Sequence, residues 1–297
     1  VAGYACSEEI GLGVSEVCFN PATQYKYRSW VLAKYGTLAR LNMEWGTCYR
    51  DESEIRGILL AEQLKLRPDN PAQWLDFRLF MEEAYNSLME ECYVKPFHQV
   101  NPDAAVGYNC GPYDEIPTQG HNTARLGKTI NYAVEYTPGF LGMYPSIGNF
   151  DVLSARKIPY LYTVVGYPTV YMKTESNYDY RVWYTILHGG RGVAWYNTLS
   201  NLSLSKFDGS FAPNGSSLLI RDINRDLRHG LGKMILNASI QPKIGIYRNR
   251  SSQYLLYYLN VRNEKNSAVR EAARIKAAES MRKDPALLSV DEDHSVI

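Results

Sequence analysis

The chain has 297 residues, of which 45% are hydrophobic and 21% are charged, a composition typical of a soluble globular protein. Its 32 basic and 31 acidic residues give a net charge of +1, which excludes a broad electrostatic field that would recruit nucleic acid or an anionic membrane. No apolar run reaches the roughly 18–20 residues of a membrane-spanning helix. We therefore expect a soluble protein, cytoplasmic or secreted, with a neutral ligand and with no nucleic-acid or membrane partner.

Tyrosine and cysteine usage bear on the kind of ligand. Tyrosine occurs 24 times against 8 phenylalanines. A tyrosine ring combines an apolar face with a polar tip, which suits the C–H faces and hydroxyl rims of sugars, although packed strand ends and helix layers use tyrosine equally well. The five cysteines include no Cys-x-x-Cys pair, so they predict neither a disulfide framework nor a zinc site. We expect no cofactor and no metal.

The start of the chain predicts a strand followed by helices. Residues 1–9 have the pattern of a short strand that ends at two carboxylates, Glu8 and Glu9. Apolar and aromatic side chains then recur at helical spacing over 21–41, where Gly36 predicts a division into two short helices. The chain begins directly in an apolar stretch without Met, which predicts a piece of a longer protein.

The clearest helix is predicted over 71–94, with Asn70 and Pro71 as its start signal. One apolar face follows helical spacing and contains Trp74, Phe77, Met81, Ala84, Leu88 and Cys92. The acidic residues of this helix are expected to form solvated helix surface: Glu82, Glu83, Glu90 and Glu91.

Strand and helix patterns alternate through the middle of the chain. The predicted strands cover 104–109, 140–144, 160–165 and 192–197, and the predicted helices lie around 130–136 and 180–187. This alternation indicates an α/β fold with a parallel sheet and crossover helices, in which reactive groups gather at the carboxyl ends of the strands. The residues at these ends are Glu9, Asn109, Tyr144, Tyr167, Trp195 and Asn197.

The last part of the chain predicts a long amphipathic helix over 217–236. A strand over 243–247 and a helix over 251–259 are expected to open a second α/β domain, followed by a helical tail. We therefore divide the chain into domains 1–240 and 241–297. The second is too short to be a complete domain of typical size.

The segment YRSWVLAKYGTLARLNMEWGT (27–47) resembles the segment that follows the acid/base strand in the β-galactosidases of glycoside hydrolase family 42. That family carries the run W-L-x-x-x-Y-G-x-L-x-x-L-N-x-x-W-G-T. The matching residues are Trp30, Tyr35, Gly36, Leu38, Leu41, Asn42, Trp45, Gly46 and Thr47.

A second segment, RVWYTILHGGRGVAWYN (181–197), is similar to the family's R-x-W-x-x-x-x-H-G-x-x-G-V run before the last barrel strand. The order of the pieces matches the family over roughly residues 1–260. The resemblance implies a partial (β/α)8 TIM barrel that holds the later strands and lacks the first three. It also implies the truncated start of a further α/β domain, which helps the family form trimers, and so a homotrimer for the full-length protein.

The resemblance further implies a retaining mechanism, in which one carboxyl group protonates the leaving oxygen and a second attacks the anomeric carbon. The family takes its acid/base from the end of the fourth strand, a position that Glu9 matches. Glu8 is the alternative acid/base. The competing interpretation is that Glu8 and Glu9 are both carboxylates on the surface of a loop, without a catalytic role.

The nucleophile departs from the family pattern. The strand over 160–165 should end in Glu and instead runs into Gly166, Tyr167 and Pro168. Glu175 is the nearest candidate and Asp179 a further option, with a solvated loop residue as the competing interpretation.

Aromatic and amide side chains at the strand ends complete the predicted site. Tyr144, Tyr167 and Trp195 are candidate stacking surfaces for sugar rings, although packing within the barrel explains them equally well. Asn109 and Asn197 are candidate partners for sugar hydroxyls.

Two functions follow from these residues. The first is hydrolysis of terminal β-galactosides by a retaining glycosidase. The second is a non-catalytic carbohydrate-binding or scaffold barrel that lacks the nucleophile. Arg181 and His188 match the family motif but lie in a predicted helix, where structural roles are expected. The family's cysteine zinc site keeps only Cys18, which agrees with the absence of a predicted metal.

Overall fold

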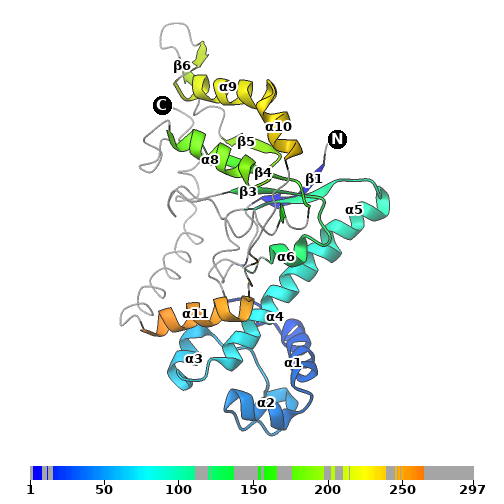
Figure 1. Ribbon diagram of the computed structural model, residues 1–297. Coiled ribbons are helices and arrows are strands. Elements are labelled where there is room, and N and C mark those ends of the chain that lie inside the picture. The colour runs from blue at the N-terminus through cyan, green and yellow to red at the C-terminus, as the bar shows by residue number, and fades with distance from the viewer. Residues whose placement is uncertain are drawn as a thin grey trace. The chain divides into compact units, whose positions relative to one another are not determined.

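Five parallel strands form the central sheet, and they follow one another across it in chain order (Figure 1). The computed structural model describes residues 3–8, 12, 16–110, 120, 122–136, 153–154, 157–165, 176–196, 202–204, 210–213, 215–238, 245, 247 and 249–263. A sheet that adds each parallel strand beside the previous one needs crossover connections and is the arrangement of a (β/α)8 barrel. The strands are β1 (Tyr4–Glu8), β2 (Val106–Cys110), β3 (Tyr132–Tyr136), β4 (Tyr160–Val165) and β5 (Gly192–Tyr196).

Helices supply most of the remaining described structure. Those between β1 and β2 are α1 (Pro21–Tyr35), α2 (Leu38–Trp45), the 3-10 turn η1 (Glu52–Glu54), α3 (Leu60–Leu66), α4 (Ala72–Met89), the π-helical η2 (Glu90–Val94) and α5 (Lys95–Val100). Those that follow are α6 (Thr123–Leu126), α8 (Ser176–Leu187), α9 (Gly215–Arg228), α10 (Leu231–Asn237) and α11 (Arg250–Asn263). A short antiparallel pair, β6 (Leu202–Leu204) and β7 (Phe211–Pro213), lies before α9.

The run from α4 through η2 to α5 is one helical stretch with a widened turn. Pro96 lies in the first turn of α5. A proline inside a helix has no N–H to donate, and its ring crowds the carbonyl four residues earlier. The π-helical turn just before Pro96 is the kind of local adjustment that relieves this conflict.

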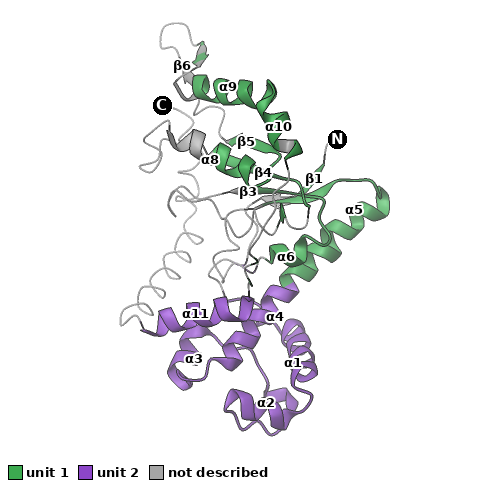
Figure 2. Cartoon of the chain, viewed as in Figure 1, with its two compact units in different colours: residues 1–11, 85–116, 121–247 green, residues 12–84, 117–120, 248–297 purple. Residues whose placement is uncertain are grey.

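The chain divides into two compact units, shown in different colours in Figure 2. The sheet unit contains residues 1–11, 85–116 and 121–247, and the helical unit contains residues 12–84, 117–120 and 248–297. The core of the sheet unit lies between the strands and their helices, where Tyr108, Ala133 and Tyr160 pack with buried helix residues such as Val182 and Ile186.

Aromatic rings form the core of the helical unit. Tyr27 is fully buried, and its ring lies 4.9 Å from that of Phe77 and 6.3 Å from that of Trp45, measured between centroids. A second cluster contains Trp74, which stacks on Tyr257 at 6.2 Å. Such ring pairs contribute about 0.5–1.5 kcal/mol each beyond the burial of their area.

Several predicted elements agree closely with the structure. The strand predicted over 160–165 is β4, and the two short helices predicted over 21–41 are α1 and α2, separated at Gly36. The long helix predicted over 71–94 is α4 with its π-helical end, and Asn70 Oδ1 accepts a hydrogen bond from the Ala72 N–H at 3.1 Å.

Two predicted elements were wrong. The helix expected around 130–136 is instead β3, whose Tyr132, Val134 and Tyr136 follow the period of two that a strand requires. The helix expected over 217–236 is two helices, because Gly230 adopts φ 112°, a backbone conformation that favours glycine and ends a helix. The predicted strand 140–144 lies outside the described residues, and within 243–247 the described Gly245 and Tyr247 belong to no strand.

Glu82 corrects the prediction of a solvated acidic face on α4. Its residue exposure is only 5%. Oε2 of Glu82 accepts hydrogen bonds from Arg250 Nε and from Tyr254 Oη, both at 2.8 Å, and the Arg250 guanidinium lies 5.3 Å from the centre of the Tyr254 ring. The carboxylate that was expected in water therefore binds α11 to α4 inside the helical unit.

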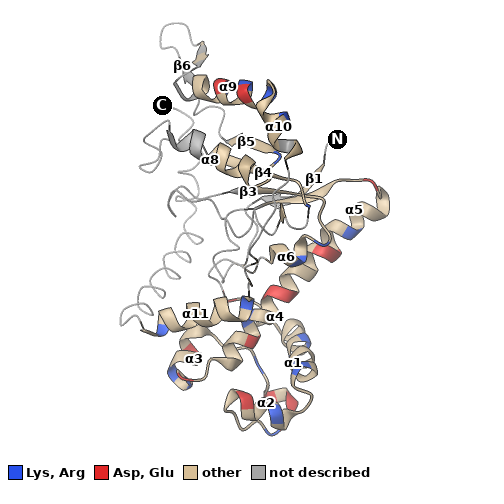
Figure 3. Ribbon diagram, in the orientation of Figure 1, with Lys and Arg blue, Asp and Glu red and all other residues tan. Residues whose placement is uncertain are grey.

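Charged residues of both signs are spread over the helices, whereas β4 and β5 carry none (Figure 3). On α9 the two signs alternate, and Arg225 pairs with Asp222 at 3.3 Å. Among the described helices, none combines the length and apolar character needed to cross a bilayer.

We expect the Tyr254→Phe variant to lose less stability than the wild-type protein when the pH is raised above about 8. Burial, followed by the negative charge of Glu82, raises the pKa of Tyr254 above its ordinary value. A raised folded-state pKa stabilises the protein below the unfolded pKa of about 10 and loses that contribution as the pH rises further. In urea titrations from about pH 8 to 11, the free energy of unfolding of the variant should fall less steeply, by up to about 1.4 kcal/mol per pH unit.

The matched control is Tyr25→Phe, at a tyrosine that is 68% exposed. It should leave the alkaline slope of the wild-type protein unchanged. Buried Tyr27, whose pKa is also raised by burial, accounts for part of the slope that persists in Tyr254→Phe. Equal slopes for the wild-type protein and Tyr254→Phe would contradict the raised pKa of Tyr254.

Candidate functional site

The carboxyl ends of β1 and β2 bring predicted site residues side by side. Asn109 of β2 is paired in register with Glu8, the last residue of β1, and with Val134 of β3. Between Ala5 and Glu8 the pairing is irregular, because β1 has one residue more than β2 over this interval. A bulge changes which side of a strand successive residues occupy. Simple alternation therefore does not choose between Glu8 and its neighbour Glu9.

The two faces of the sheet have different surroundings. Tyr108, Ala133 and Tyr160 occupy one register row and belong to the core formed with the helices. Because side chains alternate along a strand, Asn109 and Val134 lie on the opposite face. In a barrel with helices outside, that face is the interior, so Asn109 takes an interior position near the strand ends.

Trp195 lies on the other side of the sheet from Asn109. It pairs in register with Val164, two residues beyond the Tyr162–Val193 pair, and it packs against the same core cluster as Val193 and Tyr162. This placement corresponds to the packing interpretation that the sequence left open for Trp195. The structure does not bring Trp195 and Asn109 onto one face.

The Oδ1 atom of Asn109 is buried and accepts no hydrogen bond from the part of the chain that the structure describes. The side chain as a whole is only partly buried. An unmet buried acceptor costs about 1–3 kcal/mol. Asn109 is therefore a strand-end residue whose Oδ1 atom lacks, among the described residues, the partner that folding normally provides.

Five other predicted site residues lie outside the described residues. They are Glu9, Tyr144, Tyr167, Glu175 and Asn197. Their roles stay predictions. The described neighbours that fix the strand ends beside them are Glu8, Val165 and Tyr196.

The sequence analysis missed two residues near the strand ends. Thr163 is 5% exposed and lies two residues beyond Leu161, the register partner of Val134, so it shares the face of Asn109. Alternation within the predicted strand 160–165 would have found it once the core face was known. Glu135 was read as helical; in the sheet it takes the register row of Tyr162, a member of the helix-side core.

The family-like segment 27–47 is organised around a single buried carboxylate, Asp76 on α4, which is 2% exposed. Tyr35 Oη donates to Asp76 Oδ2 at 2.6 Å, and Trp45 Nε1 donates to the same oxygen at 2.9 Å. Lys34 forms an ion pair with Oδ1. Burial and the hydrogen bond to Asp76 raise the pKa of Tyr35, which keeps the phenol protonated as a donor.

Other residues of the segment shape the chain around this carboxylate. The Thr37 side chain caps α2 by accepting from the Arg40 N–H at 3.2 Å. Asn42 Oδ1 accepts from Thr47 Oγ1 at 2.8 Å and from the Tyr49 N–H at 3.0 Å, which closes the turn after α2. Gly46 ends the helix with φ 65°, in the left-handed region that favours glycine.

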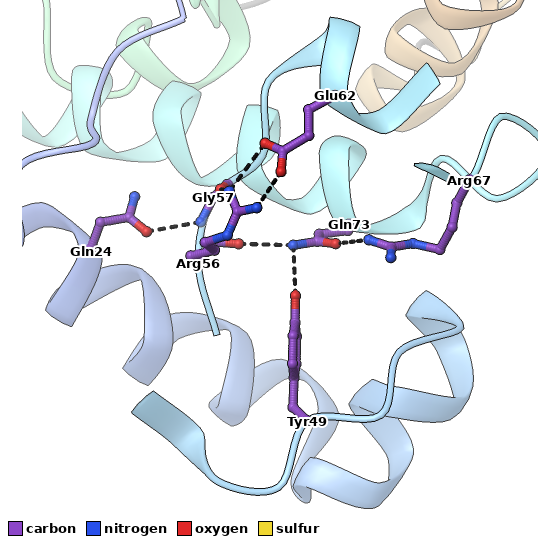
Figure 4. Close-up of polar contacts among 7 residues, drawn as sticks. All are labelled: Gln24, Tyr49, Arg56, Gly57, Glu62, Arg67 and Gln73. Carbon is purple, nitrogen blue, oxygen red and sulfur yellow. Dashed lines mark hydrogen bonds and ion pairs between the residues drawn. The ribbon is translucent and has the colours of Figure 1, made fainter. Parts of the chain in front are cut away.

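A second polar network supports the turn before α3 and is shown in Figure 4. Gln73, 1% exposed, donates through Nε2 to Tyr49 Oη at 3.1 Å and to the Arg56 carbonyl at 3.0 Å, while its Oε1 accepts from Arg67. The Arg56 guanidinium bonds Glu62 and holds the pKa of that carboxyl below its usual range. The residues of this network are hydrogen-bonded to one another, so the network has a structural role.

The second family-like segment, 181–197, sets the connection from α8 to β5. The backbone carbonyl oxygen of His188 accepts hydrogen bonds from Ser154 Oγ at 2.6 Å and from Tyr160 Oη at 2.8 Å. The imidazole ring of His188 stacks on the Tyr184 ring, with centroids 4.3 Å apart. The Arg191 N–H donates to the Tyr160 carbonyl at 2.8 Å. His188 therefore has the packing role expected of it, and the side chain of Arg181 lies outside the described residues.

Possible metal ligands do not gather in the described part of the chain. Among those residues, no group of three or more histidine, cysteine, aspartate or glutamate side chains has the geometry to hold a metal ion. Cys18 is half-buried and is a free thiol.

The fold is similar to part of the (β/α)8 barrels of solved β-galactosidases. The β-galactosidase of psychrophilic Marinomonas ef1 matches with a TM-score of 0.64 at 16% identity, over 87% of this chain and 45% of that one. The cold-adapted β-galactosidase of Rahnella sp. R3 matches with a TM-score of 0.62 at 16% identity, over 86% and 40%. Likeness at this identity shows the fold alone. It confirms the predicted α/β class with the later strands of a (β/α)8 barrel.

Sequence comparison adds a family resemblance over part of the chain. Residues 1–137 match the model of glycoside hydrolase family 42, described as beta-galactosidase. The β-galactosidases of Thermus sp. (BgaA) and Thermus thermophilus are each 32% identical over 99 residues, which are 31% of this chain and 15% of theirs. These matches confirm the family 42 resemblance predicted from the residues. The chain spans less than half of the solved relatives and a small part of the curated ones.

We expect Asp76→Ala to destabilise the helical unit by about 1–3 kcal/mol, because the variant leaves the buried Trp45 N–H and the partly buried Tyr35 hydroxyl without their acceptor. The free energy of unfolding from denaturant titration measures this loss. The control is Asp69→Ala, since the Asp69 side chain is 83% exposed and its ion pair with Arg262 should contribute at most about 1 kcal/mol. Similar losses for both variants would contradict the central place of Asp76.

Proposed function

We propose that the protein is a retaining glycoside hydrolase that cleaves terminal β-galactosides, with Glu9 as its acid/base. One observation carries the proposal: the family 42 match covers residues 1–137 and therefore includes the strand β1 and the carboxylates at its end. In a parallel barrel, groups at the carboxyl ends of the strands face the substrate. Glu8, the alternative acid/base, ends β1 beside Asn109.

The chemistry needs two carboxyl groups about 5–5.5 Å apart. Glu9 donates its proton to the glycosidic oxygen while the second carboxylate attacks the anomeric carbon and forms a glycosyl-enzyme. Water then attacks the anomeric carbon while the Glu9 carboxylate takes its proton, the bond to the second carboxylate breaks, and the sugar leaves with retained configuration. The proposed nucleophile is Glu175, between β4 and α8. Because β1 and β4 are not neighbours in the sheet, barrel curvature is what would let their ends face each other.

Interior residues at the strand ends support a sugar site. Asn109 offers an acceptor on the interior face, and Asn197 is proposed as a second hydroxyl partner. Tyr144 and Tyr167 are proposed as stacking surfaces, because a tyrosine ring matches the apolar face of a pyranose. The ligand expected at this site is therefore a neutral carbohydrate.

A second candidate function is a non-catalytic carbohydrate-binding or scaffold barrel. The observation that favours it is the sequence of β4, YLYTVV, which contains no carboxylate where the family pattern requires one. Binding of a galactoside measured by calorimetry, without turnover of an aryl galactoside, would select this function.

The arrangement of the full-length protein is part of the proposal. We divide the chain into a barrel part, 1–240, and the start of a second domain, 241–297, which would contribute to a homotrimer. Helix α11 packs within the helical unit through Tyr254 and Tyr258, so it contributes to the stability of that unit as well.

The proposed roles predict different kinetics for three variants. Glu9→Gln should lower lactose hydrolysis by about 10²–10⁴-fold. Its effect on an activated aryl galactoside should be smaller, because that leaving group needs little protonation. Glu175→Gln should lower the hydrolysis of both substrates, because nucleophilic attack is needed for each. Glu8→Gln should retain most activity if Glu9 is the acid/base.

Initial rates on the two substrates provide the measurement. Glu44→Gln, at an exposed position on α2, is the control and should hydrolyse both at wild-type rates. Full activity of Glu9→Gln together with loss in Glu8→Gln would transfer the acid/base role to Glu8. Full activity of both variants would exclude the proposed mechanism.

A further inference from the structure

The buried Oδ1 atom of Asn109 differs from the side-chain acceptors of two other asparagines near β2. Two other asparagines near β2 show the ordinary situation: Asn101 Oδ1 accepts from the Asp103 N–H at 3.2 Å, and Asn131 Oδ1 accepts from the Val106 N–H at 3.0 Å. Asn109 Oδ1 accepts no hydrogen bond from the described part of the chain. Buried polar groups are usually paired, and an exception at a strand end suggests a partner from outside the chain.

The register neighbours of Asn109 do not supply a natural donor. Val134 on β3 has no polar side-chain group, and a glutamate such as Glu8 on β1 is only an acceptor when ionised. Along β2 the residue on the same face is Gly107, where a Cβ would lie 2.2 Å from the Tyr132 carbonyl oxygen. The residues paired in register with Asn109, and Gly107 beside it on β2, therefore offer its Oδ1 atom no side-chain donor.

We propose that Asn109 is a specificity-determining residue that accepts a hydrogen bond from one hydroxyl group of the bound sugar. The inference rests on the proposed function and adds the direction of the hydrogen bond. The amide turns over a broad range about χ2, and the side chain is partly exposed, so Oδ1 reaches a donor that arrives at the strand ends. The protein then selects ligands whose hydroxyl donates, and rejects those that only accept.

Galactose analogues with one altered hydroxyl test this direction. A deoxy analogue lacks both donor and acceptor, whereas a fluoro analogue lacks the donor and keeps a weak acceptor. Calorimetry on the 297-residue chain should find one ring position at which the deoxy and fluoro analogues both bind about tenfold to hundredfold more weakly than galactose. Asn109→Leu should bind galactose as weakly as the wild-type chain binds those analogues, and should not distinguish between them.

Stability provides a second, ligand-free measurement. Asn109→Leu removes an unmet acceptor and should melt at a higher temperature than the wild-type chain. Asn101→Leu is the matched control: it removes a satisfied acceptor before the same strand, so it should melt lower and keep the wild-type sugar preference. Asn109→Asp keeps an acceptor and should retain the preference for the donating hydroxyl, should Asn109→Leu fold poorly.

The outcomes separate this inference from the proposed function. If the wild-type chain binds no galactose, the proposed function fails and takes the inference with it. If the wild-type chain binds galactose but shows no such ring position, or if Asn109→Leu keeps the discrimination, the inference alone fails. A fluoro analogue that binds as well as galactose, at the position where the deoxy analogue binds weakly, would make Asn109 a donor and overturn the proposed direction.

Discussion

The helical unit depends on the burial of one charge, the carboxylate of Asp76. An ionised carboxylate away from water is tolerated only when donors and an opposite charge surround it. Lys34, Tyr35 and Trp45 provide these groups from α1 and α2, while Asp76 itself belongs to α4. The three helices are therefore held in one arrangement, because another docking of α1 or α2 would leave the charge unpaired. The aromatic contacts of Tyr27 with Trp45 and Phe77 fill the space that this arrangement creates.

The contacts of Asp76 explain which conclusions the family-like segment 27–47 supports. Tyr35 and Trp45 donate hydrogen bonds to Asp76. Asn42 closes the turn after α2, and Gly46 ends that helix with a positive φ. These are requirements of packing and backbone geometry. The resemblance of this segment therefore indicates the fold and does not test whether the chemistry of the family is present.

The sequence predicted elements where local signals agreed with one another. In 71–94 the start signal and the apolar period coincide, and the helix is found there. In 130–136 the pattern was too short to distinguish the two periods, and pairing with β2 and β4 made the segment a strand. Glu82 could not be placed from its own helix, because its partners Arg250 and Tyr254 lie 168 and 172 residues further along the chain. Register likewise separates Asn109 from Trp195, although both were sensible strand-end candidates.

The same register argument limits where a second carboxylate can come from. The interior positions of β4 include Leu161 and Thr163, and no residue of YLYTVV is acidic. Glu135 of β3 is paired in register with Tyr162, and β5 carries no charge. Within this chain, a carboxylate that faces the end of β1 is then expected from a segment beyond a described strand, where placement is less exact than on the sheet. The nucleophile, rather than the acid/base, is therefore the residue that distinguishes the two proposed functions, hydrolysis and non-catalytic sugar binding.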